Sequence, residues 1–458
     1  MLVRVSRTVF VVGLLVCLTV TVSCSTESSE GSRPDRPNIL VILTDDQRIE
    51  TLSAMREVQN LFVDRGTRFT RAFATTPQCC PSRASILTGR YAHNHNVQTN
   101  FDAAQLDEDS TIQAYLQEAG YRTATVGKYL NRIGPYADRT NTAISPSHFD
   151  DWATFLGGYY DNLFNVNGKL EPVKQYSTKY LMETSTELLE AFEGEDEQPW
   201  FLYVTPFAPH FPARFSPKYK DAKVPTYEGN SAIGNRGQGQ PRFFVRRGGS
   251  TSFARDASDK QHRLLMSVDE MVRSIFDTLE KLDEERDTFA IFMSDNGLQW
   301  GEKGLVGKGY PYEQSIAVPL VVRWPGRVEG GATDDRIVAN IDIMPTLMEV
   351  ARIEADTKNP IDGRSLLEKG ARKDLLLEFA GLKEDGIPRW AALRTGTELY
   401  AEYYGEGGEK LMFRELYDLG KDPFQLTNLA SRPGLGDRVE EHSRRLKEVK
   451  GCSGAACP

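Results

Sequence analysis

The sequence of 458 residues is long enough for more than one domain, and its composition is that of a folded chain. Hydrophobic residues make up 40% and charged residues 26%, which excludes a disordered chain and a protein with many membrane spans. The formal net charge of -9 argues against a nucleic-acid partner, because phosphate backbones are bound by clustered Lys and Arg. An anionic substrate would therefore need a local basic pocket.

The N-terminal segment is typical of an export signal. Two arginines precede an apolar run at residues 9–22, which is too short for a comfortable membrane span. We expect residues 1–24 to be a signal peptide, residues 25–36 to be a polar linker and the protein to be exported, most simply from a bacterium. Two alternatives stay open: a lipidated Cys24 would hold a lipoprotein at a membrane surface, or the chain would be freely secreted.

Four short apolar runs are each followed at once by polar residues, and helical patterns lie between them. Alternating strands and helices predict an α/β fold, with a large, mostly parallel sheet sandwiched by helices. The polar residues after the strands would then converge on one rim of the sheet. The expected strands are 39–43, 123–126, 200–204 and 289–293, and the expected helices are 51–64, 111–119, 178–192 and 261–281.

After about residue 349 the pattern changes to short strand-like runs and a final helix at residues 439–449. We expect a large domain at residues 37–370, which would carry the site, and a smaller antiparallel sheet with one helix at residues 371–458. Cys452 and Cys457 bracket a short loop, and in an oxidising compartment this suggests a disulfide.

The adjacent Cys79 and Cys80 need another explanation, since neighbouring cysteines rarely bond to each other. They open the segment Cys-Cys-Pro-Ser-Arg-Ala-Ser-Ile-Leu-Thr-Gly-Arg. Pro81 suits the first position of a helix and Gly89 suits its end, so Cys79 is expected just before a helix N-terminus, where backbone N–H groups favour an anion. Arg83 would follow one turn later, close to the reacting atom.

This segment resembles the signature of the sulfatase family, in the alkaline phosphatase-like superfamily, in which Cys-x-Pro-Ser-Arg precedes Leu-Thr-Gly. The wider string through His93 and His95 is similar to the branch of N-acetylglucosamine-6-sulfatases and extracellular heparan 6-O-endosulfatases. The resemblance implies that a formylglycine-generating maturation enzyme oxidises Cys79 to formylglycine and that the protein hydrolyses sulfuric esters. An inert buried thiol at Cys79 is the alternative.

Four oxygen-bearing residues at two strand ends could hold a divalent metal, since hard cations prefer oxygen ligands. The resemblance implies Ca²⁺, with Mg²⁺ as a second possibility, beside the modified Cys79. Taken alone, adjacent carboxylates could equally cap the following helices. The four residues are Asp45, Asp46, Asp295 and Asn296.

Lys128, His210 and Lys308 match the positions at which the family binds sulfate. Each charge at about 4 Å could stabilise a sulfate oxygen by roughly 4 kcal/mol at an effective dielectric near 20. A lone lysine could also be a solvated surface residue.

Leu130 stands where many arylsulfatases have a histidine, which leaves the catalytic base open. His93 and His95 are candidates for this base or for substrate contacts, and ordinary polar loop residues are the alternative.

The resulting hypothesis is hydrolysis of a sulfate monoester, with 6-O-sulfate on a glucosamine-type sugar as the expected substrate and an aryl sulfate as a generic one. In the implied mechanism, one hydroxyl of hydrated formylglycine attacks sulfur and the second lets sulfate leave by elimination. A phosphomonoester or phosphonate hydrolase of the same fold is one alternative. A lipoprotein that binds sulfated glycans without turnover is another.

Overall fold

The computed structural model describes residues 36–131, 144–195, 198–354, 359–405, 407–408 and 410–458. The predicted signal peptide, nearly all of the predicted linker and Cys24 lie outside these residues. Within the described ranges, no helix combines the length and apolar character that crossing a bilayer requires.

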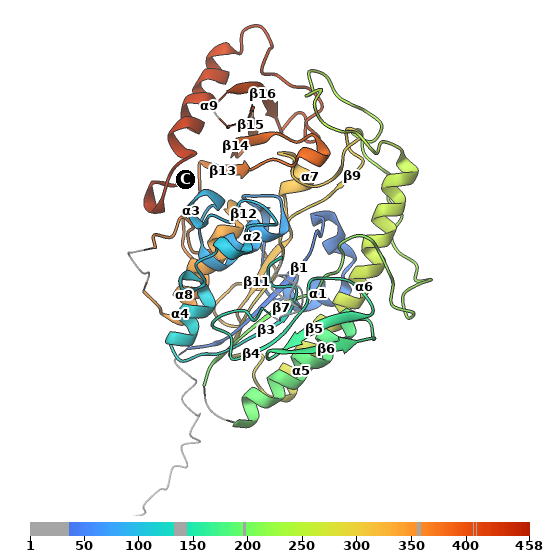
Figure 1. Ribbon diagram of the computed structural model, residues 1–458, viewed down its shortest axis with the longest axis vertical. Helices are drawn as coiled ribbons and strands as arrows, with labels where there is room; N and C mark the ends of the chain where they lie inside the picture. Colours follow the sequence, from blue (N-terminus) through green and yellow to red (C-terminus); the bar gives the residue numbers. More distant parts are fainter. Residues whose placement is uncertain (1–35, 132–143, 196–197, 355–358, 406, 409) are drawn as a thin grey trace, which may run out of the picture. The chain divides into compact units, whose positions relative to one another are not determined.

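A ten-stranded sheet contains all four strands that the sequence predicts (Figure 1). They lie side by side at its centre in the order β8-β1-β7-β3, and each pairs in parallel with its neighbour. Nearly every residue of these strands is buried, because both faces of the sheet are covered. Their bounds are β1 (Asn38–Thr44), β3 (Arg122–Gly127), β7 (Trp200–Thr205) and β8 (Thr288–Ser294).

Six further strands extend the sheet on both sides of this parallel centre. The order is β12-β2-β11 beyond β8 and β4-β5-β6 beyond β3, and the antiparallel pairs of the sheet lie in these flanks. Their bounds are β2 (Thr67–Phe73), β4 (Asp151–Thr154), β5 (Asn162–Val166), β6 (Lys169–Val173), β11 (Leu320–Arg323) and β12 (Ala332–Ala339).

Helices cover both faces of the sheet, since alternate residues of β1 belong to two different hydrophobic cores. One core contains side chains of α2 (Cys79–Thr88), α4 (Ile112–Glu118) and α8 (Ile343–Ala351). The other contains side chains of α5 (Ser177–Glu195) and α6 (Thr251–Lys281). The predicted α/β sandwich is therefore confirmed.

Two predicted helices differ from the structure. The one expected at residues 51–64 is instead a 3₁₀ helix η1 (Ile49–Ala54), a short α1 (Arg56–Val58) and a π-helical η2 (Gln59–Val63). Asp269 of α6 accepts hydrogen bonds from the backbone of Glu57 and Val58 at 3.0 and 2.9 Å, and so starts a new helical turn there. The second, α6, begins at Thr251 rather than residue 261, because Ser250 caps a first part whose buried face is made of small residues, Ala254, Ala257 and Ser258, and so gives a weak apolar pattern.

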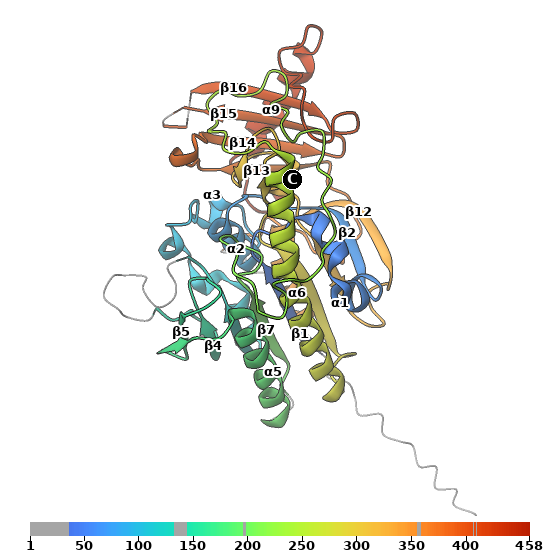
Figure 2. The ribbon, with the colours of Figure 1, turned by 90° about the vertical axis from the view of Figure 1, so that its right-hand side faces the viewer.

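The C-terminal part forms a separate antiparallel sheet in the order β13-β14-β15-β16, with α9 packed on β14 and β15 (Figure 2). This confirms the predicted smaller unit, and Cys452 and Cys457 form a disulfide after α9. The predicted boundary after residue 370 stays a prediction, since residues 36–458 pack as one unit. The bounds are β13 (Asp374–Phe379), β14 (Arg389–Thr395), β15 (Glu398–Tyr404), β16 (Leu411–Asp418) and α9 (Gly436–Val449); short elements elsewhere are α3 (Ala92–His95), α7 (Glu313–Ile316), β9 (Gln299–Trp300) and β10 (Val306–Gly307).

Gly127 at the end of β3 allows a close approach of two strands. Its φ is 123°, and a Cβ would lie 2.2 Å from the carbonyl oxygen of Thr205 in β7. We expect Gly127→Ala to lower the free energy of unfolding by about 2 kcal/mol or more, measured by urea denaturation. Gly168 also has a positive φ, of 84°, but a Cβ there would have nothing within 4 Å, so Gly168→Ala is the control. Equal losses in the two variants would show that the clash with Thr205 is unimportant.

Candidate active site

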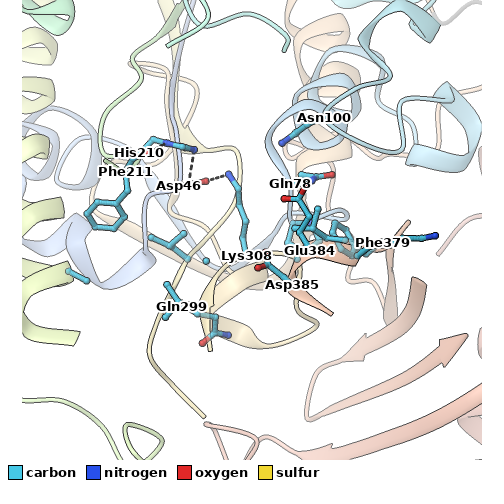
Figure 3. Close-up of a pocket in the computed structure, with 18 of the residues that line it drawn as sticks. Asp46, Gln78, Asn100, His210, Phe211, Gln299, Lys308, Phe379, Glu384 and Asp385 are labelled. Atoms are coloured by element: carbon cyan, nitrogen blue, oxygen red, sulfur yellow. Dashed lines mark hydrogen bonds and ion pairs between the residues drawn. The ribbon is translucent and has the colours of Figure 1, made fainter. Parts of the chain in front are cut away.

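A cavity of about 720 Å³ opens where the central strands end, and Asp46, His210 and Lys308 are among its lining residues (Figure 3). Asp46 directly follows β1 with a φ of 66°, in a left-handed conformation that is unusual for a residue other than glycine. Its backbone N–H donates to Asp295 Oδ1 at 3.1 Å, which ties the ends of β1 and β8 together. Strained backbone of this kind is frequent at functional sites.

Cys79 is the first residue of α2, so this helix begins two residues earlier than the sequence predicts. Gln78 has an extended backbone and precedes the helix, and Pro81 occupies the third position, where its missing N–H still costs no helical hydrogen bond. The predicted end is confirmed, since Gly89 has a φ of 64° and its N–H bonds to Ser85 O at 2.9 Å. Cys79 thus lies at the positive end of a ten-residue helix.

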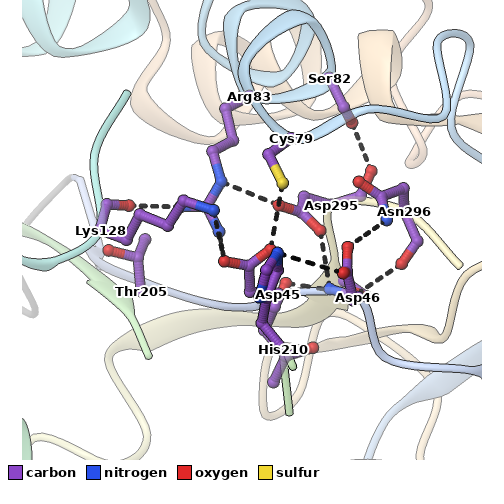
Figure 4. Close-up of polar contacts among 12 residues, drawn as sticks. Asp45, Asp46, Cys79, Ser82, Arg83, Lys128, Thr205, His210, Asp295 and Asn296 are labelled. Carbon is purple, nitrogen blue, oxygen red and sulfur yellow. Dashed lines mark hydrogen bonds and ion pairs between the residues drawn. The ribbon is translucent and has the colours of Figure 1, made fainter. Parts of the chain in front are cut away.

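The predicted oxygen-bearing residues surround Cys79 (Figure 4). The Cys79 thiol donates to Asp45 Oδ1 at 3.3 Å, and Asn296 Nδ2 donates to Asp46 Oδ1 at 2.6 Å. One side-chain atom each of Asp45, Asp46, Cys79 and His210 lies within 4.8 Å of the others. The strand ends therefore bring together residues that are more than 200 positions apart in the sequence.

Arg83 and Lys128 are buried cations on one side of this cluster. Arg83 Nε donates to Asp295 Oδ2 at 2.9 Å, and its Nη2 lies 3.7 Å from Asp45 Oδ2. Lys128 Nζ donates to Asp45 Oδ2 at 2.5 Å, while its backbone carbonyl accepts a hydrogen bond from Arg83. These contacts hold both cations in fixed positions.

Lys308 and His210 lie on the cavity side. Lys308 Nζ donates to Cys79 Sγ at 2.7 Å and also contacts Asp46. His210 Nε2 lies 3.4 Å from Asp46 Oδ2, and its Nδ1 lies 2.5 Å from the carbonyl oxygen of Phe211. That carbonyl can only accept, so Nδ1 carries a proton and Nε2 points toward the cluster.

Burial raises the pKa of Asp45, but the nearby positive charges outweigh this effect and hold the pKa well below its ordinary value. Those charges belong to Lys128, His210, Arg83 and Lys308.

Burial, and then the charge of Asp45, raises the pKa of the Cys79 thiol to about 12. An unmodified thiol here is protonated at neutral pH and is a weak nucleophile.

The residues present fit a divalent cation. Hard cations prefer carboxylate and amide oxygens, and Asp45, Asp46 and Asp295 supply three carboxylates. Asn296 is fully buried, and its Oδ1 has no hydrogen-bond partner among the described residues. A metal ion would satisfy this oxygen, which otherwise carries the cost of an unpaired buried acceptor.

Three supporting residues were missed by the sequence analysis. Gln261 donates to the carbonyl of Asp46 at 2.8 Å, Asn340 donates to Ser82 Oγ at 2.9 Å, and the hydroxyl of Tyr159 donates to the carbonyl of His210 at 2.7 Å. Gln261 could have been recognised from the sequence, because it is a polar residue on the otherwise apolar face of a predicted helix, α6.

The structure does not bring His93 or His95 to the cluster. His95 is buried, pairs with Ser85 at 3.0 Å, and has a pKa lowered by burial to about 3. His93 lines a different cavity, of about 310 Å³, and its Nδ1 lies 3.0 Å from Glu378. Leu130 belongs to the hydrophobic core, so its side chain takes no part in the polar cluster.

Comparisons with known proteins agree with this geometry. The family model described as Sulfatase matches residues 37–353, and the model described as N-sulphoglucosamine sulphohydrolase, C-terminal, matches residues 301–451. An N-acetylglucosamine-6-sulfatase from Homo sapiens is 30% identical over 479 residues, which cover 92% of this chain and 86% of the relative.

Two solved structures share the fold. A protein in complex with its substrate D-glucosamine-2-N,6-O-disulfate has a TM-score of 0.78 at 22% identity, covering 90% of this chain and 97% of that one. A phosphonate monoester hydrolase from Silicibacter pomeroyi has a TM-score of 0.70 at 20% identity, and the match covers 90% of this chain and 94% of that one. The protein is thus a sulfuric ester hydrolase by class. It belongs to the sulfatase family, whose members generally use formylglycine and a divalent metal.

Ca²⁺ should raise the melting temperature of the metal-stripped protein, because it would bind the native cluster and not the unfolded chain. At 100 times the Kd the gain is about 2.7 kcal/mol, which we expect as an increase of a few degrees in calorimetry. Asn296→Ala should respond less, whereas Asp334→Asn, at a carboxylate paired with Arg336 outside the cluster, should respond as the wild type does. A melting temperature insensitive to both Ca²⁺ and Mg²⁺ would contradict a metal site.

His93 should contribute a pH-dependent part of the stability. Burial lowers its pKa, but the hydrogen bond and charge of Glu378 raise it further, to about 9 from 6.5. Because the folded-state pKa is the higher one, this stabilisation is complete below about pH 6.5 and is lost as the pH rises toward 9. In urea unfolding, wild type should lose more stability than His93→Gln between pH 6 and pH 9. Parallel pH profiles of the two proteins would reject the assignment.

Proposed function

We propose that the protein hydrolyses 6-O-sulfate monoesters on glucosamine-type sugars at the cluster around residue 79. The observation that carries this proposal is the position of Cys79, at the start of α2 and in contact with both a carboxylate and an ammonium group. The name of the human relative and the substrate in the similar structure support a sulfated glucosamine.

Formylglycine at position 79 would supply a hydrated aldehyde able to attack sulfur, and Ca²⁺ or Mg²⁺ held by the four oxygen-bearing residues would supply positive charge. Those residues are Asp45, Asp46, Asp295 and Asn296.

The cations divide into an inner and an outer pair. The side chains of Arg83 and Lys128 are 0% and 5% exposed, whereas those of Lys308 and His210 are 17% and 28% exposed. The outer pair lines the cavity and can contact sulfate oxygens directly. The inner pair lowers the pKa of Asp45 and holds both Asp45 and Asp295 in place, so that these groups are arranged before the substrate arrives.

His210 is the proposed proton donor to the departing sugar alcohol. Its Nδ1–H is committed to the carbonyl of Phe211, which fixes the ring, while Nε2 faces the cluster. A proton on Nε2 could pass to the ester oxygen as the bond to sulfur breaks.

Three parts of the proposal lie outside the site. Residues 1–24 would export the chain, which is then secreted or held at a membrane by a lipidated Cys24. A formylglycine-generating enzyme would modify residue 79 beforehand.

A phosphonate or phosphomonoester hydrolase is a second candidate function, favoured by the fold shared with the phosphonate monoester hydrolase. Sulfate and phosphate esters place their anionic oxygens similarly, so the cluster could bind either. The kcat/KM for an aryl sulfate and for an aryl phosphonate, measured on the same preparation, would separate the two. A strong preference for the phosphonate would reject the main proposal.

The test of the proposal is Cys79→Ala, made with co-expression of a formylglycine-generating enzyme. We expect a folded protein whose turnover of a sulfate ester is lower by at least about a thousandfold, because the nucleophile is removed. Peptide mass spectrometry should show the conversion of residue 79 in the wild type. The neighbouring Cys80 is equally buried, and Cys80→Ala should keep both conversion and turnover. Wild-type turnover in folded Cys79→Ala would overturn the scheme.

A further inference from the structure

Two buried glutamines are among the residues that line the active-site cavity, and each has side-chain polar atoms without a partner among the described residues (Figure 3). Gln299 is 1% exposed, and neither its Nε2 nor its Oε1 has a partner among the described residues. Gln78 is 7% exposed, and its Oε1 likewise lacks one within the described chain. Gln78 precedes α2, but its side chain makes no capping hydrogen bond.

An unpaired buried amide is costly, so its presence beside a cavity calls for an explanation. Burying such a group without a partner costs about 1–3 kcal/mol, and most buried amides are paired. Gln425 shows the usual structural role: it is fully buried, donates to the carbonyl of Pro311 at 3.3 Å and accepts from Glu313 N–H at 2.9 Å. Gln299 has no such structural bonds within the described residues.

The cavity also offers apolar surface. Phe211, Phe253, Phe379 and Leu298 line it, and Phe253 is 39% exposed. A pyranose ring has apolar C–H faces and a polar edge of hydroxyl or acetamido groups. Aromatic walls for the faces and amides for the edge together match such a ring.

We propose that Gln299 and Gln78 bind the uncharged ring substituents of the sugar whose sulfate lies at residue 79. An amide is neutral and offers both donors and an acceptor, as hydroxyl and acetamido groups do. A second sulfate would instead need cations, and the other lysines that line the cavity, Lys260 and Lys383, are accompanied there by Asp256, Glu384 and Asp385. This inference rests on the proposed function and names the residues that select the sugar within it.

The test is Gln299→Met, which keeps the length of the side chain and removes the amide. The ratio of kcat/KM for N-acetylglucosamine 6-sulfate to that for an aryl sulfate should fall at least about tenfold, because one or more hydrogen bonds to the sugar are lost. The melting temperature of the ligand-free protein should stay the same or rise, since an unsatisfied buried amide is removed. Gln117→Met, on α4 and bonded to Asp150, should change neither quantity.

An unchanged ratio, or a melting temperature lowered by several degrees, would overturn the inference and leave the sulfatase proposal intact. If wild type with verified formylglycine cleaves neither ester, the proposed function fails instead. Calorimetric binding of N-acetylglucosamine 6-sulfate in the Cys79→Ala background then decides the inference alone, without turnover. A tenfold weaker Kd on adding Gln299→Met supports it, and an equal Kd overturns it.

Discussion

The buried charges at the ends of the central strands are the constraint on which the rest of the structure depends. The side chains of Asp45, Asp46 and Asp295 are at most 4% exposed, and an unpaired buried carboxylate costs several kcal/mol. Each therefore needs a cation within contact distance, and the cations come from segments distant in sequence. Only a fold in which parallel strands end at one rim brings these partners together, which is why the sheet and the site form as one arrangement.

Pairing these charges also prepares the site for its reaction. Arg83 contacts both Asp45 and Asp295, so it neutralises the carboxylates without facing the substrate. Lys308 bridges Cys79 and Asp46 at the cavity wall, where an ester oxygen would replace one of its contacts. Because the dipoles and charges are already oriented, little reorganisation is needed when charge develops on the substrate. Asn296 Oδ1, which has no hydrogen-bond partner in the described part of the chain, is an oxygen that a divalent ion would satisfy.

The centre of the fold could be predicted from the sequence because its strands are short, continuous apolar runs that end in polar residues. The breaks in the helix at residues 49–63 could not be predicted. The side chain of Asp269, in α6, determines where the helical turn restarts, and this long-range contact is not visible in the local apolar periodicity. The cations were found through the family resemblance rather than through pattern. Gln299 could not be predicted by pattern or by resemblance, because an isolated glutamine has no sequence signature and its proposed role rests on side-chain atoms that lack partners among the described residues.

Charge alone cannot explain how this site would choose its substrate. Three carboxylates face Arg83, Lys128 and Lys308, which leaves the cluster close to neutral before a metal binds. A divalent ion would then leave a net positive charge that attracts a sulfate ester, with one negative charge, and a phosphate ester, with up to two. These charges act on the ester group and not on the molecule that carries it, so selection of one sulfate ester over another has to come from contacts with the rest of the substrate farther along the cavity. Uncharged amides and aromatic walls supply contacts of that kind, and they discriminate through the hydrogen bonds left unmade when the wrong ligand binds.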